Sequence, residues 1–412
     1  MDLSPVKQTG CRLGCAVAIG AVLVLGVAPS DAAQSLRVLL SADVAKLEVQ
    51  ADSSVWVSDV TRHGRAIRSA VRIVPSGKGF SVNGIRMARE QLTLRGEQGL
   101  TLTLAKPNGT PNGTPKDPSK PGGDQRLTVP VSGLVHVVRR GGGFLVINQV
   151  DLEEYVKGVV PAEVNSAWHP EMLKAQAVAA RTYALYQQML SPTRDYDVVA
   201  TVQDQVYRGK QGIDAAILRA VEETRGLVLT YQGAPIYAAF SSTAAGLTED
   251  AVNVWSKEYP YLKGVECPFD LASPYYQWTT SFKRDLLEQN LRQQGFAVGT
   301  ITAMTPLAFS RGGRVTTLRL VHSEGELVLR GEELRKAVGY MVVPSTQFTV
   351  DSVGQEIVLS GYGAGHAVGM CQWGAKELAE LGYPFSTILK YYYPDTELQD
   401  MALTKAPTPP SS

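Results

Sequence analysis

The chain has 412 residues, 44% of them hydrophobic, so it is long enough for two or three domains with substantial cores. Its 40 lysines and arginines are balanced by 39 aspartates and glutamates, which leaves a net charge of +1. A chain with this balance has no general electrostatic attraction for nucleic acid or for an anionic membrane surface, and we expect neither as a partner.

The first 32 residues have the pattern of an export signal. Lys7 and Arg12 precede an apolar run at residues 13–27, and small residues follow that run. The run is short for a membrane span, so residues 1–32 are interpreted as a cleaved signal peptide. The alternative is a retained N-terminal anchor, which would then be the only membrane contact. In either case we expect an exported protein that works in the periplasm or cell wall.

Composition divides the rest of the chain into four parts. Residues 35–105 contain short β-branched runs such as LRVLL and LTLTL, which predict a small β-rich domain. Residues 106–125 are rich in Pro, Gly and Asn and predict a flexible linker or loop. Residues 126–400 alternate strand-like and helix-like runs, and the polar residues 401–412 predict a disordered tail. The expected fold class is α+β.

Two helices are predicted in the middle of the chain. Asp151 is a suitable N-cap with Glu154 three residues later, and Gly158 is expected to stop this first helix. Pro170 begins a second helix that runs to about Leu190 and carries alanines on several faces. Because small side chains let neighbours approach closely on every side, we predict that the second helix is central and buried.

Glu163 is an isolated carboxylate in the sequence VVPAEV, in the turn expected between these helices. Apolar neighbours there would desolvate it and raise its pKa. A carboxylic acid that stays protonated near neutral pH can donate a proton to a leaving group. The alternative is an ordinary salt bridge to Lys174 or Arg181. Arg181 lies in the buried helix and needs a carboxylate partner in any case.

A glycine-rich loop at residues 361–369 precedes a helix predicted near Cys371–Leu381. The loop has neither the Gly-Lys-Ser/Thr ending nor the G-x-G-x-x-G spacing of nucleotide-binding loops, so no nucleotide is expected. His366 lies five residues before Cys371, which is compatible with a thiol hydrolase. The mature chain has a second cysteine, Cys267, so Cys371 is also a candidate for a disulfide bond.

Cys267 and Cys371 are the two cysteines that remain once the signal is removed. In an oxidising compartment they predict one disulfide; the alternative is two small buried hydrophobic residues. The sequence has no CxxC motif and no His/Cys cluster with metal-ligand spacing. We therefore expect no metal and no cofactor.

Three blocks of this sequence resemble the stage II sporulation protein D family, SpoIID/LytB. They are NQVDLEEYVKGVVPAEVNSAWHPEMLKAQAVAARTYAL, FSSTAAGLTEDAVNVWSKEYPYLKGV and GYGAGHAVGMCQWGAKELAELGYPFSTILKYYYPDTEL. The blocks occur in the family's order and the likeness covers residues 127–400. The resemblance implies a SpoIID/LytB-like mixed α/β core over residues 126–400, around the alanine-rich helix.

The resemblance implies action on peptidoglycan. One branch of the family consists of lytic transglycosylases, whose catalytic acid occupies the block matching VVPAEV and hence corresponds to Glu163. The other branch enhances a separate cell-wall amidase, and the sequence leaves both readings open. As a transglycosylase, Glu163 would protonate the oxygen between N-acetylmuramic acid and N-acetylglucosamine. It would then accept the proton of the muramic 6-hydroxyl, which leaves a 1,6-anhydro end and needs no second carboxylate.

Some relatives hold zinc with a His-Cys pair just before Gln-Val-Tyr. This chain has Gln203 and Asp204 in those places, so the resemblance does not carry a zinc site. The matched blocks supply the further residues expected to bind substrate, which are Arg181, Ser241, Ser242, Glu249, His366, Gln372, Tyr391 and Tyr392.

Overall fold

The computed structural model describes residues 34–59, 64–67, 70–105 and 126–405. The predicted signal peptide and the predicted linker at residues 106–125 lie outside these ranges. The described residues are rich in strand and also contain eight helices, which confirms the α+β class.

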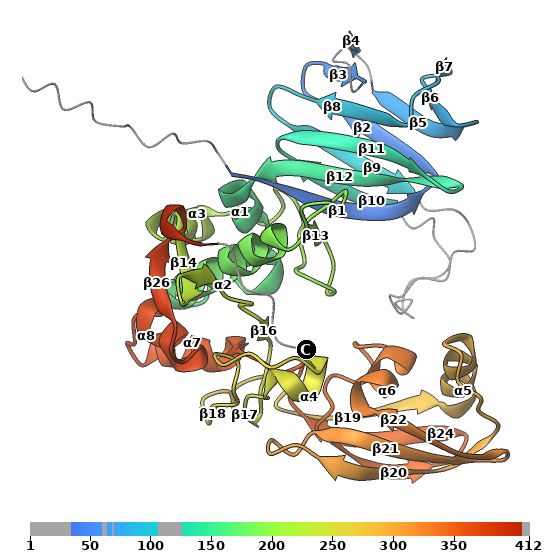
Figure 1. The fold of residues 1–412 in the computed structure, drawn as a ribbon, viewed down its shortest axis with the longest axis vertical. Coiled ribbons are helices and arrows are strands. Elements are labelled where there is room, and N and C mark those ends of the chain that lie inside the picture. Colours follow the sequence, from blue (N-terminus) through green and yellow to red (C-terminus); the bar gives the residue numbers. More distant parts are fainter. Residues whose placement is uncertain (1–33, 60–63, 68–69, 106–125, 406–412) are drawn as a thin grey trace, which may run out of the picture. The chain divides into compact units, whose positions relative to one another are not determined.

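The N-terminal region is β-rich, as predicted, and forms two antiparallel-dominated sheets (Figure 1). Alternation explains the strands: in β9, Leu100, Leu102 and Leu104 are buried and the residues between them are not. The first sheet has the order β13-β1-β12-β11-β8-β3-β4 and the second β10-β9-β2-β5-β6-β7. Their bounds are β1 Ser35–Val44, β2 Lys46–Gln50, β3 Val55–Ser58, β4 Gly64–Ile67, β5 Val71–Ser76, β6 Gly79–Val82, β7 Ile85–Met87, β8 Gln91–Arg95, β9 Leu100–Ala105, β10 Arg126–Val131, β11 Leu134–Arg140, β12 Gly143–Asp151 and β13 Val198–Val199.

Strands from beyond the predicted linker complete both sheets. β10 pairs with β9, β11 pairs with β8, and β12 pairs with β1 over most of its length. The β-rich part of the fold therefore extends to Asp151, and the sheets do not divide at residue 126.

Helix α2 (Pro170–Met189) is the central buried helix that the alanines predicted. It contacts α1 (Leu152–Glu163), α3 (Ala215–Glu223), α7 (Gln372–Glu380), α8 (Phe385–Tyr392) and the strand β14 (Leu227–Tyr231). Its alanines at 175, 177, 179, 180 and 184 are fully buried. β14 pairs with β15 (Ala234–Pro235) and β26 (Glu397–Asp400).

The first helix is longer than predicted. Asp151 caps α1 by accepting from the backbone N–H groups of Glu153 and Glu154, as expected. However, α1 does not stop at Gly158 but continues to Glu163. Gly158 serves close approach instead, since a Cβ there would lie 2.3 Å from the carbonyl oxygen of Gly209. Glu163 is thus the last residue of a helix and not part of a free turn.

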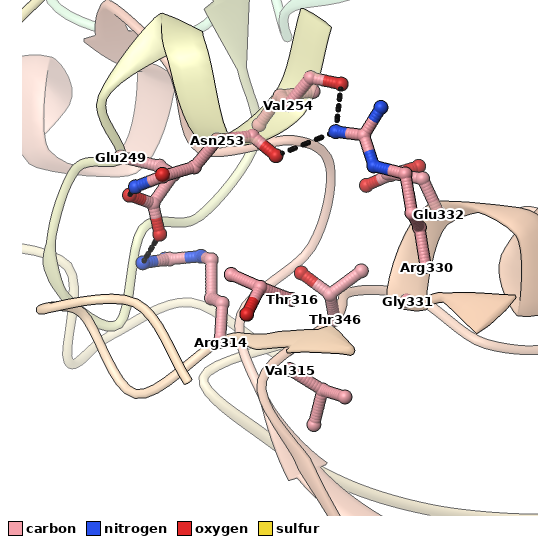
Figure 2. Close-up of a pocket in the computed structure, with 10 residues that line it drawn as sticks. All are labelled: Glu249, Asn253, Val254, Arg314, Val315, Thr316, Arg330, Gly331, Glu332 and Thr346. Carbon is pink, nitrogen blue, oxygen red and sulfur yellow. Dashed lines mark hydrogen bonds and ion pairs between the residues drawn. The ribbon is translucent and has the colours of Figure 1, made fainter. Parts of the chain in front are cut away.

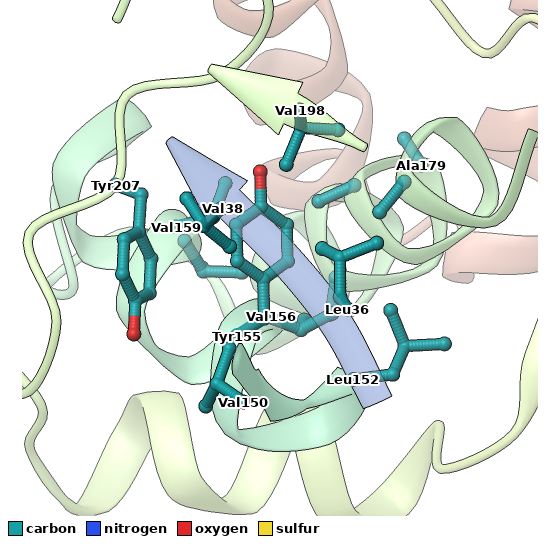
Figure 3. Packing of buried hydrophobic residues seen from close by; sticks show 14 of the residues in the cluster. Leu36, Val38, Val150, Leu152, Tyr155, Val156, Val159, Ala179, Val198 and Tyr207 are labelled. Carbon is teal, nitrogen blue, oxygen red and sulfur yellow. The ribbon is translucent and has the colours of Figure 1, made fainter. Parts of the chain in front are cut away.

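The sheets and the helices share one hydrophobic core. Figure 3 shows its centre, where Tyr155 of α1 stacks on Tyr207 with ring centroids 5.0 Å apart. Leu36 and Val38 of β1 pack against the same cluster, as does Ala179 of α2. This continuity fixes α1 against the β-rich region on one side and α2 on the other.

Residues 277–362 form a second hydrophobic core of their own. Two three-stranded sheets, β19-β24-β23 and β20-β21-β22, pack with helices α5 and α6. Their bounds are β19 Gln277–Lys283, α5 Arg284–Gln293, β20 Ile301–Phe309, β21 Val315–His322, β22 Gly325–Arg330, α6 Gly331–Val338, β23 Phe348–Val353 and β24 Glu356–Tyr362.

Short elements flank this second core and end the described chain. They are β16 Phe240–Ser241, β17 Gly246–Leu247, α4 Ala251–Trp255, β18 Glu266–Cys267, β25 Met370–Cys371 and the 3-10 helix η1 Met401–Leu403. The predicted disorder of residues 401–412 is wrong for residues 401–405, because the Lys405 N–H donates to the Gly233 carbonyl oxygen at 2.7 Å. Among the described residues, no helix is long and apolar enough to cross a membrane.

Candidate active site

Glu163 lies at the end of α1, in the wall of a cavity of about 550 Å³. Its Oε1 accepts a hydrogen bond from the backbone N–H of Val206 at 2.7 Å, and it is also hydrogen-bonded to the side chain of Gln372. A cavity of this volume is large enough for a small-molecule or sugar ligand. The lining residues are Pro161, Ala162, Glu163, Val164, Asn165, Ser166, Trp168, Gly212, Ser242, Tyr275, Gln372 and Trp373.

Desolvation raises the pKa of Glu163 to about 7. The hydrogen bonds from Val206 and Gln372 and the positive charge of Arg208 act in the opposite direction, but more weakly. The predicted alternative of a salt bridge is wrong, because Lys174 pairs with Glu171 and Glu223. Glu163 therefore holds a proton that it can exchange near neutral pH.

A second polar side chain holds Gln372 in place. The Nε2 of Gln372 donates to Oε1 of Gln176 at 3.3 Å, and Gln176 is a buried residue of α2. Gln176 is fully buried, and its own Nε2 has no hydrogen-bond partner within the described chain. The central helix thus reaches Glu163 through a chain of two glutamine side chains.

Aromatic side chains form another part of the cavity wall. Trp168 and Trp373 meet edge to face with centroids 5.1 Å apart, and the ammonium of Lys376 lies 5.5 Å from the Trp373 ring. Tyr275 is 46% exposed and lines the same cavity. None of these three rings was predicted as a site residue. For two of them, closeness in sequence to a predicted site residue could have indicated the site, since Trp168 follows Glu163 by five positions and Trp373 is adjacent to Gln372.

Comparisons with known proteins identify the family to which this chain belongs. A family model described as Stage II sporulation protein matches residues 140–231, which contain α1, α2 and Val206. Stage II sporulation protein D of Bacillus subtilis is 35% identical over 272 residues, covering 62% of this chain and 76% of the relative. The chain belongs to the SpoIID family.

Two more relatives and a second model extend the comparison. An uncharacterized protein of Brachyspira hyodysenteriae is 30% identical over 331 residues, covering 80% of this chain and 82% of the relative. The amidase enhancer of B. subtilis is 32% identical over 288 residues, and the match spans only 40% of that longer protein. A domain of unknown function, DUF8618, matches residues 252–369 and so includes the whole second core of this SpoIID-family protein.

Arg181 is not a substrate-binding residue in this SpoIID-family protein. Its Nε and Nη2 donate to the two carboxylate oxygens of Glu153 at 2.7 Å each, and Nη1 donates to the Leu227 carbonyl oxygen. The side chain is fully buried, so no ligand can reach it. The expectation that Arg181 needs a carboxylate was right, but the partner comes from the start of α1.

Ser241 and Ser242 were both predicted to bind substrate, but only Ser242 lines the cavity that contains Glu163. The Ser241 hydroxyl accepts from the Ala367 N–H, which holds the glycine-rich loop in place. Glu249 is also absent from this cavity. It lines a separate pocket of about 10 Å³, where it lies 3.8 Å from the guanidinium of Arg314 (Figure 2).

The other residues predicted to bind substrate, His366, Tyr391 and Tyr392, lie in the hydrophobic core or at its edge. The His366 ring packs on Trp255 with centroids 5.0 Å apart, and burial lowers the pKa of His366 to about 3, so the imidazole is neutral. The Tyr391 hydroxyl donates to the Glu266 carbonyl oxygen, and the Tyr392 hydroxyl lies 3.3 Å from Sγ of Cys267. These three side chains are not among the lining residues of the Glu163 cavity.

The predicted disulfide is also absent. Cys267 and Cys371 are both buried and both free. The two Sγ atoms nevertheless lie within 4.8 Å of each other, and burial, followed by a hydrogen bond between the two thiols, raises the pKa of Cys371. They therefore form a pair of buried, free thiols beneath the start of α7.

Proposed function

We propose that this protein is a peptidoglycan lytic transglycosylase in which Glu163 is the acid and then the base. Membership of the SpoIID family supports a function in the cell wall. The observation that carries the finer proposal is a carboxyl group with a pKa near 7 at the wall of a cavity of about 550 Å³. Such a group can be protonated at neutral pH and still transfer its proton.

In the first step Glu163 donates its proton to the glycosidic oxygen between N-acetylmuramic acid and N-acetylglucosamine, and the C–O bond to the leaving sugar breaks. The carboxylate that forms is stabilised by the Val206 N–H and the Gln372 side chain, which already contact it. In the second step the muramic 6-hydroxyl oxygen bonds to the anomeric carbon and gives its proton to Glu163. The acid is regenerated and a 1,6-anhydro ring is formed.

A single carboxylate suits this intramolecular reaction. Hydrolytic glycosidases use a pair of carboxyl groups, because one must activate water or act as nucleophile. Glu163 is the one acidic side chain among the residues that line the cavity in the described structure. Trp168, Trp373 and Tyr275 offer apolar ring faces and edges against which a sugar chain can pack.

A second candidate function is enhancement of a separate cell-wall amidase. It is favoured by the 32% identity to the B. subtilis protein named amidase enhancer. As an enhancer, the protein would use the same cavity to hold glycan, with no bond broken there.

Digestion of glycan strands freed of stem peptides, followed by mass spectrometry of the products, tests the proposal. The wild type should release 1,6-anhydromuramic ends, and Glu163→Gln should not. Glu154→Gln is a matched control, because it removes another α1 carboxylate that pairs with Lys157 and does not line the cavity. Reducing muramic ends would mean that water is the nucleophile. No cleavage, together with amidase stimulation that survives Glu163→Gln, would establish the enhancer.

We also propose that the protein is exported, on the Lys7 and Arg12 pattern at its start. Cell fractionation with N-terminal sequencing should find a mature chain that begins near Ala33 outside the cytoplasm. A full-length chain in the cytoplasm would contradict both export and access to peptidoglycan.

A further inference from the structure

Three potential metal ligands meet in the core beneath the start of α7. Cys267 ends β18, Asp270 follows it in the next turn, and Cys371 is the N-cap residue of α7. The two Sγ atoms and a carboxylate oxygen of Asp270 all lie within 4.8 Å of one another. All three residues are at most 1% exposed, so water does not compete freely for their donor atoms.

The spacing of the donor atoms fits one small metal ion. Cys371 Sγ lies 3.3 Å from Oδ2 of Asp270. A zinc ion with tetrahedral bonds of about 2.3 Å to sulfur and 2.0 Å to oxygen would separate those two atoms by roughly 3.5 Å. The existing distance is therefore close to that of bound donors, and little movement is needed.

Asp270 is held firmly but is incompletely bonded. Its Oδ2 accepts from the backbone N–H groups of Ala244 and Ala245 at 2.8 and 2.7 Å. Its Oδ1 is buried and has no hydrogen-bond partner in the described part of the chain. An unfilled acceptor on a buried carboxylate is costly, and a cation beside it would remove that cost.

The surroundings also suit a negatively charged metal-thiolate group. Cys371 Sγ accepts from the N–H groups of Ala244 and Gly374, the latter in the first turn of α7. The buried guanidinium of Arg314 donates to the Ala244 carbonyl oxygen and interacts electrostatically with both cysteines and Asp270. Two thiolates and one carboxylate carry three negative charges; a divalent cation would neutralise two of them, and Arg314, which also pairs with Glu249, would attract the third.

We propose that Cys267, Asp270 and Cys371 bind one Zn²⁺ ion, with a fourth position for a small oxygen ligand such as water. Thiolate sulfur favours zinc over magnesium or calcium. As each Zn–S bond forms, the thiol releases its proton to solvent, so binding strengthens as the pH rises. Gly374 fits this assignment, since a Cβ there would lie 2.5 Å from Cys267 Sγ.

The ion would join the turn at residues 266–270 to the start of α7. Gln372 and Trp373, which line the Glu163 cavity, directly follow the ligand Cys371. The proposed ion is therefore structural and supports one wall of the cavity. This inference does not depend on which cell-wall function the cavity has.

Metal titration of the reduced full-length chain tests the proposal. The protein is stripped of metal with chelator under reductant, transferred to anaerobic buffer and titrated with Zn²⁺ and separately with Co²⁺. We expect about one equivalent of either ion, a higher melting temperature with Zn²⁺, and a thiolate-to-cobalt absorption band with Co²⁺. Asp270→Asn should weaken binding by more than about tenfold, and Cys267→Ser or Cys371→Ser should abolish it.

The double variant Cys11→Ser/Cys15→Ser is the matched control, because it removes the other two cysteines of the chain and should bind metal as the wild type does. If the cysteine variants do not fold, the cobalt spectrum of the wild type decides alone. Reduced, reactive thiols at Cys267 and Cys371 without metal uptake would overturn the proposal. So would a chain that isolates with a Cys267–Cys371 disulfide and takes up no zinc after reduction.

Discussion

Replacing Glu163 with glutamine should stabilise the protein at pH 8 and have little effect on its stability near pH 4. The wild-type carboxyl group is neutral at the lower pH and ionised at the higher one. Only the ionised form pays the desolvation cost that raises its pKa to about 7. Glutamine keeps the shape and the oxygen that accepts from the Val206 N–H, but it never ionises.

The expected size follows from the shift in pKa. The folded-state pKa of about 7 lies above the ordinary value of 4.5, so the folded protein binds the proton more tightly than the unfolded chain. The stability from this group is fully present below pH 4.5, falls as the pH rises towards 7, and is lost above 7. At about 1.4 kcal/mol per pKa unit, the difference between 4.5 and about 7 makes the loss at most roughly 3.5 kcal/mol. Glu163 is only partly shielded from solvent, so we expect about 1–3 kcal/mol.

The pH dependence of the free energy of unfolding can be measured by urea unfolding of the wild type, Glu163→Gln and the control Glu154→Gln across pH 4 to 8.5. The difference between wild type and Glu163→Gln should open between pH 4.5 and 7, while other titrating groups cancel in the comparison. Glutamine should also lower the glycan-cleavage rate by about 100-fold to 10,000-fold, and wild-type activity should decline above pH 7. A stability difference that is the same at pH 4.5 and pH 8 would refute the desolvated acid.

Three further substitutions test the surroundings of Glu163. Gln372→Met removes a hydrogen bond that lowers the pKa of Glu163, so the alkaline limb of the pH–rate profile should move to higher pH; an unchanged limb would show that Gln372 does not act on the acid. Arg181→Met leaves the Glu153 carboxylate buried without its ion-pair partner and should cost about 3–5 kcal/mol in urea unfolding, whereas a loss of glycan affinity at unchanged stability would restore Arg181 as a ligand-binding residue. Trp373→Ala should raise KM for glycan more than it lowers kcat, and the reverse pattern would place Trp373 at the reacting bond instead of along the sugar chain.

The sequence predicted those features that depend on local patterns. Short β-branched runs marked the strands of the N-terminal region, and the alanines marked α2 as the buried helix. Glu163 was found because it is an isolated acid among apolar neighbours, and that isolation is what desolvates it in the fold. Gln372 was found through the family resemblance.

Features that depend on contacts between distant segments were not predictable in the same way. Gly158 looks like a helix stop, but it is a glycine because the backbone at Gly209 passes beside α1. Tyr392 looks like a sugar-binding ring in the sequence, but it is fully buried beside Cys267. In each case the sequence shows the residue type, and only the tertiary fold shows which neighbour requires it.

Helix α1 is fixed at both ends, and this explains why residues far from the cavity matter to Glu163. At its start, Glu153 is clamped by the bidentate contact of Arg181 from α2. At its middle, Gly158 lets the segment with Gly209 lie close, and the same segment supplies the Val206 N–H that holds Glu163 at the end of the helix. A shift of α1 along its axis would break the ion pair at one end and the hydrogen bond at the other. Arg181 therefore helps to position Glu163 without contacting a ligand. Burying its charge is costly, but the ion pair with Glu153 offsets that cost and fixes the start of α1.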